Sequence, residues 1–146
     1  MSEIIEGLEH KGRVTILYVE DDDDTRPGIK RLLISRGYRV IIAGNEEEAL
    51  ERAEDGRIHA DLLLIDLGLP PADVLAAGHR IRHAALTDDQ TPLVVMAFKY
   101  NSEMEGQNVH AGHHDWVTYL GNAEQLELLM TACYVSTRPH HLRITN

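Results

Sequence analysis

Two apolar segments of the chain end in carboxylates, and these acids are the residues whose types and spacing favour chemistry. The segment 16–19 runs directly into Glu20 and Asp21, the first two of five consecutive acids. The segment 60–65 ends at Asp66. Adjacent carboxylates repel one another, so such a group needs a positive charge close by. Oxygen ligands without Cys or His favour a hard cation, and the acids therefore predict a Mg²⁺ site.

The elements that must position these acids alternate along the chain. β-branched and apolar residues predict strands buried on both faces, at 14–19, 38–43, 60–66, 91–98 and 115–120. Helical spacing of apolar residues, with capping residues at several starts, predicts helices at 25–37, 45–56, 72–85, 102–112 and 122–133. The connections between these segments are short, which is typical of α/β units.

Five successive strand–helix units predict an α/β fold of the flavodoxin-like (βα)5 type, with one doubly wound, parallel, five-stranded sheet. The expected strand order, 2-1-3-4-5, makes the first and third strands neighbours. Functional groups of such sheets gather at the carboxyl ends of the strands, where the strand order reverses. Glu20, Asp21 and Asp66 are therefore expected to meet in one pocket.

Composition predicts one soluble domain. The chain has 146 residues, of which 43% are hydrophobic and 26% charged, enough to bury one core. We expect this domain to span residues 13–135, between tails at 1–12 and 136–146. The net charge of -10 argues against nucleic acid or an anionic membrane as a partner. A single cysteine, apolar runs of strand length only and an acidic start indicate a cytoplasmic protein.

Three motifs resemble the receiver domain of response regulators, a family of two-component signalling, over about residues 13–134. The motifs are ILYVEDD at 16–22, DLLLIDLGLP at 61–70 and AGHHDWVTYL at 111–120. The resemblance implies that Asp66 accepts a phosphoryl group from a histidine kinase or a histidine phosphotransfer protein. It also implies that Glu20, Asp21, Asp66 and the backbone carbonyl of Gly68 hold the Mg²⁺ ion. An aspartate carboxylate can attack phosphorus, and the ion offsets the charge that builds during transfer.

Two positions depart from the family pattern. Alignment of the fourth strand puts Ala97 where the family carries a Ser or Thr hydroxyl that follows the phosphoryl group. Alignment of the fifth strand puts Tyr119 where the family carries a Lys, while Trp116 fills the position of the switch aromatic. Lys99, two residues beyond Ala97, is a candidate replacement for the missing positive charge. The resemblance is therefore to an atypical receiver whose conformational switch is altered.

Two functions follow from these residues. The first is a stand-alone receiver, not an enzyme, that is phosphorylated on Asp66 and signals through contact with a downstream protein. The alternative is a phosphorylation-independent pseudo-receiver that serves as a protein-binding module, an interpretation that Ala97 and Tyr119 favour. The resemblance also suggests a homodimer that pairs through the fourth helix, fifth strand and fifth helix.

Two other interpretations are weaker. A hydrolase of the haloacid dehalogenase type also uses a strand-end Asp with Mg²⁺, but it requires a second Asp two residues later, where this chain has Gly68. His110, His113 and His114 form a cluster that suggests zinc. Zinc needs three or four well-placed ligands, and we expect these histidines in an exposed turn between a helix and a strand.

Overall fold

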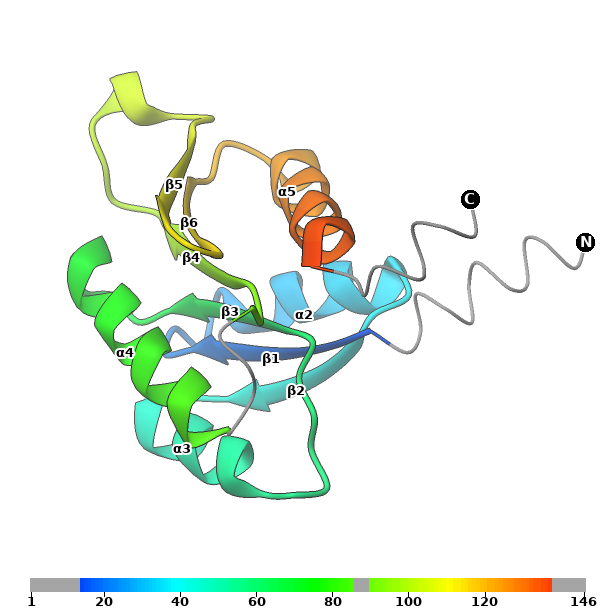
Figure 1. Cartoon of the computed structure of the whole chain (residues 1–146). Helices are drawn as coiled ribbons and strands as arrows, with labels where there is room; N and C mark the ends of the chain where they lie inside the picture. Colours follow the sequence, from blue (N-terminus) through cyan, green and yellow to red (C-terminus); the bar gives the residue numbers. More distant parts are fainter. Residues whose placement is uncertain (1–13, 86–89, 138–146) are drawn as a thin grey trace, which may run out of the picture.

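The computed structural model describes residues 14–85 and 90–137 and contains one sheet with helices on both faces (Figure 1). The strands are β1 (Thr15–Glu20), β2 (Arg39–Ala43), β3 (Leu62–Asp66), β4 (Leu93–Ala97), β5 (Asn108–Gly112) and β6 (Asp115–Tyr119). The helices are α2 (Arg26–Ser35), α3 (Glu46–Glu54), α4 (Pro71–Ala84) and α5 (Ala123–Thr137), with a 3-10 turn at Ser102–Met104. The tails predicted at 1–12 and 136–146 lie largely outside the described residues, and the domain boundaries stay a prediction.

The sheet order is β2-β1-β3-β4-β6-β5, and every neighbouring pair from β2 to β6 is parallel. The five predicted strands keep their predicted order, so the α/β fold of the flavodoxin-like type is confirmed. β1 lies between β2 and β3, and Glu20 is the register partner of Asp66. The first and third strands therefore end at the same edge of the sheet, as the apolar runs predicted.

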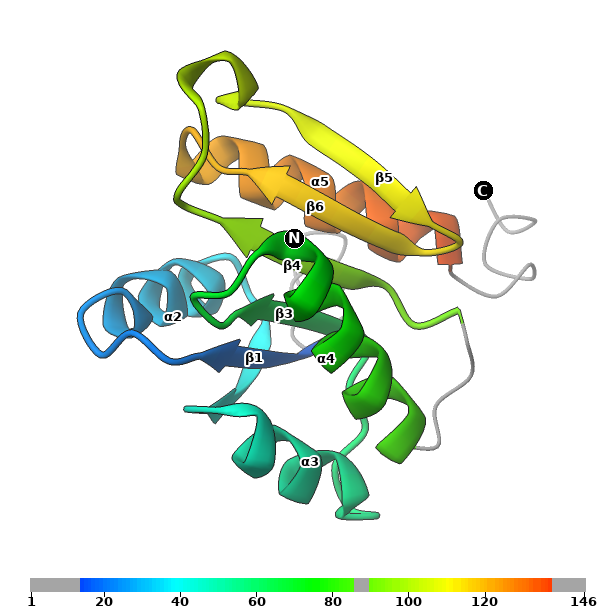
Figure 2. The same ribbon diagram turned by 90° about the vertical axis from the view of Figure 1, so that its left-hand side faces the viewer.

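The core has two layers because the strands are apolar on both faces. On one face, α3 and α4 cover alternate strand residues such as Leu17 and Val19 (Figure 2). On the other face, α2 and α5 cover Ile16 and Tyr18. Period-two alternation within a strand sends successive side chains to opposite layers. The acids that end the strands are consequently held on a rigid, fully packed support.

Side-chain caps define the starts of two helices. The Asn45 side chain accepts a hydrogen bond from the Glu48 N–H at 2.8 Å, which is the predicted cap of α3. The Asn122 side chain accepts one from the Gln125 N–H at 2.9 Å, at the start of α5. Such caps satisfy backbone donors that have no partner inside the helix.

The helix predicted at 102–112 is wrong. After the short 3-10 turn the chain forms β5, which pairs antiparallel with β6, so the sheet has six strands within residues 14–85 and 90–137, and not five. Gly106 and Gly112 adopt positive φ values of 84° and 138°, which a continuous helix excludes. All five residues of β5 are exposed, so the segment lacks the buried apolar stripe that stabilises a surface helix.

Gln125 fastens the β5–β6 hairpin to α5. Its side-chain amide donates to Asn108 Oδ1 and to Thr118 Oγ1, both at 2.9 Å, and its carbonyl oxygen accepts from the Gly121 N–H at 2.8 Å. Thr118 also donates to Asn108 Oδ1 at 2.8 Å. One side chain therefore joins two strands and the start of the last helix.

Gly78 lets α4 approach β4 closely, and its replacement by Ala is expected to lower the free energy of unfolding. A Cβ at this position would lie 2.6 Å from Leu93 Cδ2, and Leu93 is fully buried. Overpacking costs about 1–3 kcal/mol, which exceeds the gain of about 1 kcal/mol in helix propensity. Urea unfolding measures the loss. Gly28→Ala in α2, where no heavy atom lies within 4 Å of the added Cβ, is the control. An unchanged midpoint for Gly78→Ala would contradict the close approach.

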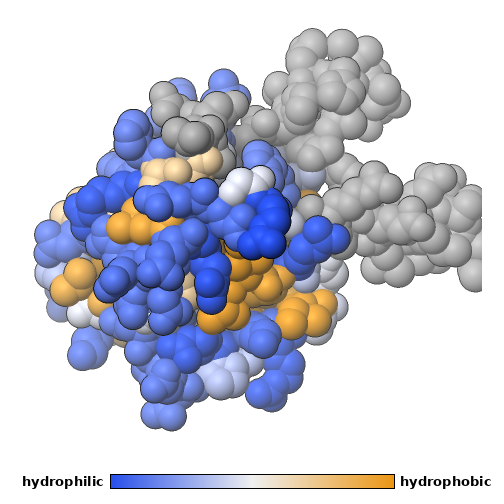
Figure 3. Space-filling model, turned by 90° about the horizontal axis from the view of Figure 1, so that it is seen from below, coloured by the Kyte–Doolittle hydropathy of each residue, from blue (hydrophilic) through white to orange (hydrophobic). Residues whose placement is uncertain are grey.

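The outer surface over α3 is mainly hydrophilic, with smaller apolar patches between the polar side chains (Figure 3). The large apolar side chains that the structure leaves exposed are Ile34, Leu69, Phe98, Val109 and Leu128. None of the helices described at 14–85 and 90–137 has both the length and the apolar character of a membrane span.

Candidate functional site

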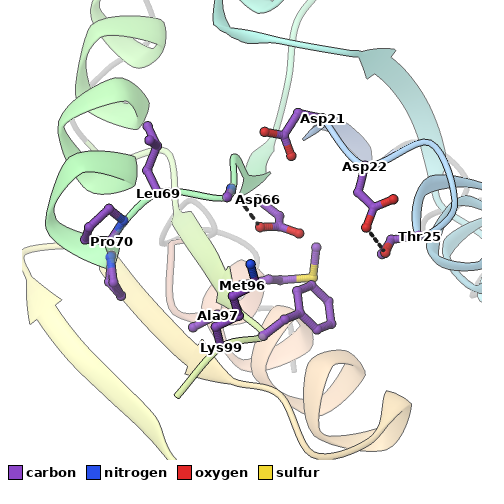
Figure 4. Close-up of a pocket in the computed structure, with 12 residues that line it drawn as sticks. Asp21, Asp22, Thr25, Asp66, Leu69, Pro70, Met96, Ala97 and Lys99 are labelled. Carbon is purple, nitrogen blue, oxygen red and sulfur yellow. Dashed lines mark hydrogen bonds between the residues drawn. The ribbon is translucent and has the colours of Figure 1, made fainter. Parts of the chain in front are cut away.

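A pocket of about 530 Å³ opens at the carboxyl ends of β1, β3 and β4. Its polar and small lining residues include Asp21, Asp22, Asp66, Gly68, Ala97 and Lys99. In the close-up, the three aspartates lie around one side of the pocket, and Ala97 and Lys99 lie across from them (Figure 4). The structure thus brings together Asp21, Asp66, Gly68 and the candidate Lys99, as the sequence predicted, whereas Glu20, which was expected in the same pocket, does not line it.

Asp66 and Asp21 meet at Gly68. The Gly68 N–H donates to Asp66 Oδ1 at 3.4 Å, and Gly68 adopts a positive φ of 61°. A Cβ at this position would lie 3.4 Å from Asp21 Oδ2, so the Asp21 carboxylate lies directly against the turn. The Asp21 N–H also donates to the Asp66 carbonyl oxygen at 3.4 Å. Glycine therefore keeps the two carboxylates and its own carbonyl within one small space.

Glu20 is fully buried and does not line the pocket. Its Oε1 accepts a hydrogen bond from the Tyr18 hydroxyl at 2.8 Å, and its carboxyl group shares another with Asp66. Burial and the contact with Asp66 together raise the pKa of Glu20 to about 8, against the opposing effect of the Tyr18 hydrogen bond. Two carboxyl groups share a hydrogen bond only when one carries a proton. Glu20 and Asp66 therefore share one proton at the back of the pocket.

Tyr18 holds the carboxyl group of Glu20 behind the pocket, a contact that the sequence reasoning missed. It is fully buried, and burial together with the Glu20 carboxylate raises the pKa of its hydroxyl. The available signal was its position two residues before Glu20, which places both side chains on the same face of β1. A tyrosine in an otherwise aliphatic buried strand needs a hydrogen-bond partner, and Glu20 is the nearest polar residue on that face.

Burial raises the pKa of Asp66, and the negative charges of Asp21 and Asp22 raise it as well. The hydrogen bonds from Glu20 and from the Gly68 N–H act in the opposite direction but do not offset these effects. The negative charges of Asp21 and Asp22 thus disfavour a further negative charge on Asp66, and a bound cation would offset this repulsion.

Arg26 orders the acidic loop that follows β1. Its guanidinium donates to the Glu20 carbonyl oxygen at 2.7 and 3.1 Å and forms an ion pair with Asp23 at 2.9 Å. Asp22 accepts from the Thr25 hydroxyl at 3.0 Å. Arg26 and Thr25 thus hold this acidic turn against the start of α2, which leaves Asp21 and Asp22 to face the pocket.

The ionisation of buried Glu20 is expected to make the free energy of unfolding depend on pH. A carboxyl group whose folded pKa of about 8 exceeds its ordinary value of 4.5 contributes stability below the ordinary value and loses it as the pH rises through 8. The free energy of unfolding without divalent cations should therefore fall between about pH 5 and pH 9. Glu20→Gln keeps the shape without ionising and should flatten this fall in urea titrations. Glu47→Gln, on the exposed side of α3, is the matched control. An equally steep fall in Glu20→Gln would contradict the assignment.

Tyr119 and Trp116 do not line the pocket. The Tyr119 ring packs edge-on against Tyr100, with centroids 5.5 Å apart, and the Tyr100 hydroxyl donates to the Leu120 carbonyl oxygen at 2.6 Å. Trp116 stacks on His110 at 4.7 Å, in the layer covered by α5. Tyr119, at the position where the family carries a Lys, therefore makes an aromatic contact with Tyr100, and β6 contributes no positively charged side chain to the pocket.

The oxygen donors of the pocket fit Mg²⁺ better than a metal that needs many protein ligands. Across residues 14–85 and 90–137, no three His, Cys, Asp or Glu side chains are arranged to hold a metal ion, which applies to His110, His113 and His114 as well. Mg²⁺ is typically bound by only one or two carboxylates and keeps several waters. Asp21, Asp66 and the Gly68 carbonyl match that need, while Glu20 faces Tyr18.

The amino-acid sequence matches a known protein family over most of its length. The response regulator receiver domain family matches residues 16–130. A cyclic di-GMP phosphodiesterase of Thermotoga maritima is 33% identical over 118 residues, which cover 81% of this chain and 30% of that protein. The transcriptional regulatory protein DltR of Streptococcus agalactiae is 30% identical, covering 76% of this chain and 47% of the relative. The chain thus spans about half or less of the length of these relatives.

Solved structures agree on the fold. A two-component response regulator from Clostridium difficile superimposes with a TM-score of 0.64 at 20% identity, covering 87% of this chain and all of the other. The chemotaxis protein CheY4 of Vibrio cholerae gives 0.60 at 19% identity, covering 82% and 98%. With the family match over most of its length, the chain belongs to the response regulator receiver domains, the domains of two-component signalling that accept a phosphoryl group.

Proposed function

We propose that Asp66 of this chain accepts a phosphoryl group from a histidine kinase or a histidine phosphotransfer protein in the cytoplasm, and that the phosphorylated domain acts through contact with a downstream protein. The observation that supports this is the Asp66 carboxylate at an open pocket, flanked by Asp21, Gly68 and Lys99. The proposal concerns the receiver domain itself and is the same for the chain alone or within a longer protein.

In the proposed reaction a phosphoryl group is transferred from a phosphohistidine to Asp66, and each pocket residue has a separate role. A carboxylate oxygen of Asp66 bonds to phosphorus as the P–N bond of the phosphohistidine breaks, and the electron pair stays with the imidazole, which takes up a proton. The Gly68 N–H orients Asp66 through Oδ1. Glu20 donates its hydrogen bond to Asp66, so Asp66 is the carboxylate of the pair and can act as the nucleophile. The product is an acyl phosphate on this chain, with no turnover of an external substrate.

Mg²⁺ held by Asp21, Asp66 and the Gly68 carbonyl would neutralise charge on the transferred oxygens. A response regulator from Thermotoga maritima, similar at 21% identity with a TM-score of 0.58, was solved in complex with Mg²⁺ and BeF. This relative supports Mg²⁺ as the ion to test, since its fold is shared and the oxygen donors of the present pocket suit the same ion.

Intact mass measurement tests the proposal. The protein is incubated with Mg²⁺ and a small phosphodonor and then weighed, with a parallel sample in EDTA. A single phosphoryl adduct that requires Mg²⁺ is the expected result. If the protein takes no adduct at any donor concentration, the proposal is wrong.

Lys99 is expected to supply the positive charge that Tyr119 does not. Lys99 lines the pocket opposite Asp66, on the segment that follows β4. Replacement of Lys99 by Ala should slow adduct formation about tenfold, a change of about 1.4 kcal/mol in the barrier. Lys30→Ala removes an equal charge from exposed α2, outside the pocket lining, and should leave the rate unchanged. Equal rates for the two variants would exclude Lys99.

Two positions favour a second candidate, a pseudo-receiver that binds its target without phosphorylation. Ala97 lines the pocket but has no hydroxyl that could follow a phosphoryl oxygen. Tyr119 contacts Tyr100 and not the pocket. The mass experiment separates the candidates, because the pseudo-receiver predicts no adduct while target binding persists.

A further inference from the structure

The carboxyl group of Glu20 lies behind the pocket and has several hydrogen-bond partners there. Tyr18 and Glu20 are two residues apart on β1, so their side chains lie on the same face of the strand, and both are fully buried. The Tyr18 hydroxyl donates to Glu20 Oε1 at 2.8 Å, and the Asp22 N–H donates to Oε2 at 3.3 Å. The same carboxyl group shares a hydrogen bond with Asp66. These contacts hold the side chain of Glu20 outside the pocket lining.

The main chain of Glu20 is fixed, so only its side chain could take another direction. The carbonyl oxygen of Glu20 accepts two hydrogen bonds from the Arg26 guanidinium, at 2.7 and 3.1 Å. Within the sheet, Glu20 is the register partner of Asp66. The next residue, Asp21, lines the pocket (Figure 4). A rotation of the Glu20 side chain would therefore bring a third carboxyl group toward the side of the pocket where Asp21 and Asp66 lie.

We propose that Tyr18 is a positioning residue that holds Glu20 away from the Mg²⁺ ion and thereby lowers the affinity of the site. The ion is then held by two carboxylates, those of Asp21 and Asp66, and by the Gly68 carbonyl. This role rests on the proposed Mg²⁺ site, whose affinity it sets. A buried carboxyl oxygen that loses its hydrogen-bond donor needs another partner. The Tyr18 hydroxyl and the cation thus compete for the same carboxyl group.

The competition affects the pocket both with and without a cation. Without a cation, a third carboxylate that faces the pocket would add to the repulsion between Asp21 and Asp66. The hydrogen bond from Tyr18 avoids this repulsion because it keeps Glu20 turned toward the core. With a cation, each additional carboxylate ligand strengthens binding. Removal of the Tyr18 hydroxyl should therefore make cation binding tighter.

Mn²⁺ binding provides the test, because carboxylate and carbonyl oxygens bind this ion as they bind Mg²⁺. Electron paramagnetic resonance measures free Mn²⁺ in solutions of the unphosphorylated full chain at one neutral pH, and competition then gives the affinity for Mg²⁺. Tyr18→Phe removes only the hydroxyl group. Tyr38→Phe is the matched control, since Tyr38 is a buried tyrosine of the same core layer and lies outside the pocket lining.

Tyr18→Phe is expected to bind Mn²⁺ about tenfold more tightly than the wild type, while Tyr38→Phe binds it like the wild type. The gain should disappear when Tyr18→Phe is combined with Glu20→Gln, because the amide carries no charge. Equal or weaker binding by Tyr18→Phe, or a gain that persists in the double variant, would overturn the role of Tyr18. The absence of Mn²⁺ binding in both the wild type and Tyr18→Phe would overturn it as well.

A second comparison does not depend on the folding of Tyr18→Phe. In the wild-type background, Asp21→Asn should weaken Mn²⁺ binding about tenfold, while Glu20→Gln should change it by less than about twofold. Equal losses would overturn the role of Tyr18, since Glu20 would then be a ligand in spite of the hydrogen bond.

The phosphoryl adduct is a separate measurement. If the protein shows the expected Mn²⁺ affinities but takes no adduct, phosphorylation is refuted and the role of Tyr18 is supported. If it takes the adduct but Tyr18→Phe binds Mn²⁺ like the wild type, only the role of Tyr18 is refuted.

Discussion

Asp66→Asn is expected to abolish the phosphoryl adduct while leaving the fold at least as stable as the wild type. The amide of Asn has no nucleophilic oxygen of comparable strength, so the acyl phosphate cannot form. The same change removes a carboxyl group whose pKa is raised by burial and by Asp21 and Asp22. Stability at neutral and alkaline pH should therefore hold or rise, because an unfavourable ionisation is lost.

Intact mass and urea unfolding, measured on the same preparation, separate loss of chemistry from loss of fold. Asp73→Asn, in the first turn of α4 and outside the pocket lining, is the control and should take the adduct like the wild type. An adduct on Asp66→Asn of wild-type yield would assign phosphorylation to another acid. Asp21 and Asp22, which line the same pocket, would then be the candidates.

Asp115→Ala is expected to lower the free energy of unfolding by about 3 kcal/mol, because it removes the carboxylate that balances the charge of a largely buried cation. The Asp115 carboxylate lies 2.6 Å from His79 Nε2 and 2.9 Å from Arg82 Nη1, so it ties α4 to the first residue of β6. The side chain of Arg82 is only 13% exposed. Urea unfolding at neutral pH measures the loss. Asp55→Ala, which breaks an exposed pair with Arg57, should leave stability nearly unchanged.

The loss of stability at low pH provides a second test of the ion pairs that Asp115 makes with His79 and Arg82. Burial raises the pKa of Asp115, but hydrogen bonds from His79 and Arg82 outweigh it, and the pKa stays below its ordinary value. A group with a lowered folded pKa contributes stability above the ordinary value and loses it as the pH falls through the folded value. The wild type should therefore lose stability below about pH 4, and Asp115→Asn should lack this component. If the free energy of unfolding falls equally in both proteins as the pH is lowered, Asp115 is not the cause of the loss.

The meeting of Glu20, Asp21 and Asp66 was predictable because it depends on strand order and on the length of two apolar runs. Both are strong signals in a sheet buried on both faces. The orientation of Glu20 was not predictable in the same way. The Glu20 side chain is turned toward the core by its hydrogen bond with Tyr18. From the sequence, a single aromatic residue within an apolar strand indicates only a packed core residue.

The segment after β4 was mispredicted because its local signals favour a helix and its structure is decided elsewhere. Ser102 and Glu105 have capping spacing, yet Glu105 ends only a 3-10 turn. The partners of this segment are distant in sequence: Gln107 accepts from the Tyr119 N–H at 2.8 Å, and Asn108 contacts Gln125. Tertiary pairing of this kind overrides helix propensity.

The contacts of Gln125 have a mechanical consequence. Because this side chain bonds Asn108, Thr118 and the Gly121 backbone, the hairpin and the last helix form one stiff block. Residues that belong to a shared hydrogen-bond network tend to respond together. A displacement that starts at the end of β4 would then move the hairpin and α5 together as a rigid body. A protein bound to either the β5–β6 hairpin or α5 would therefore be affected by the same movement.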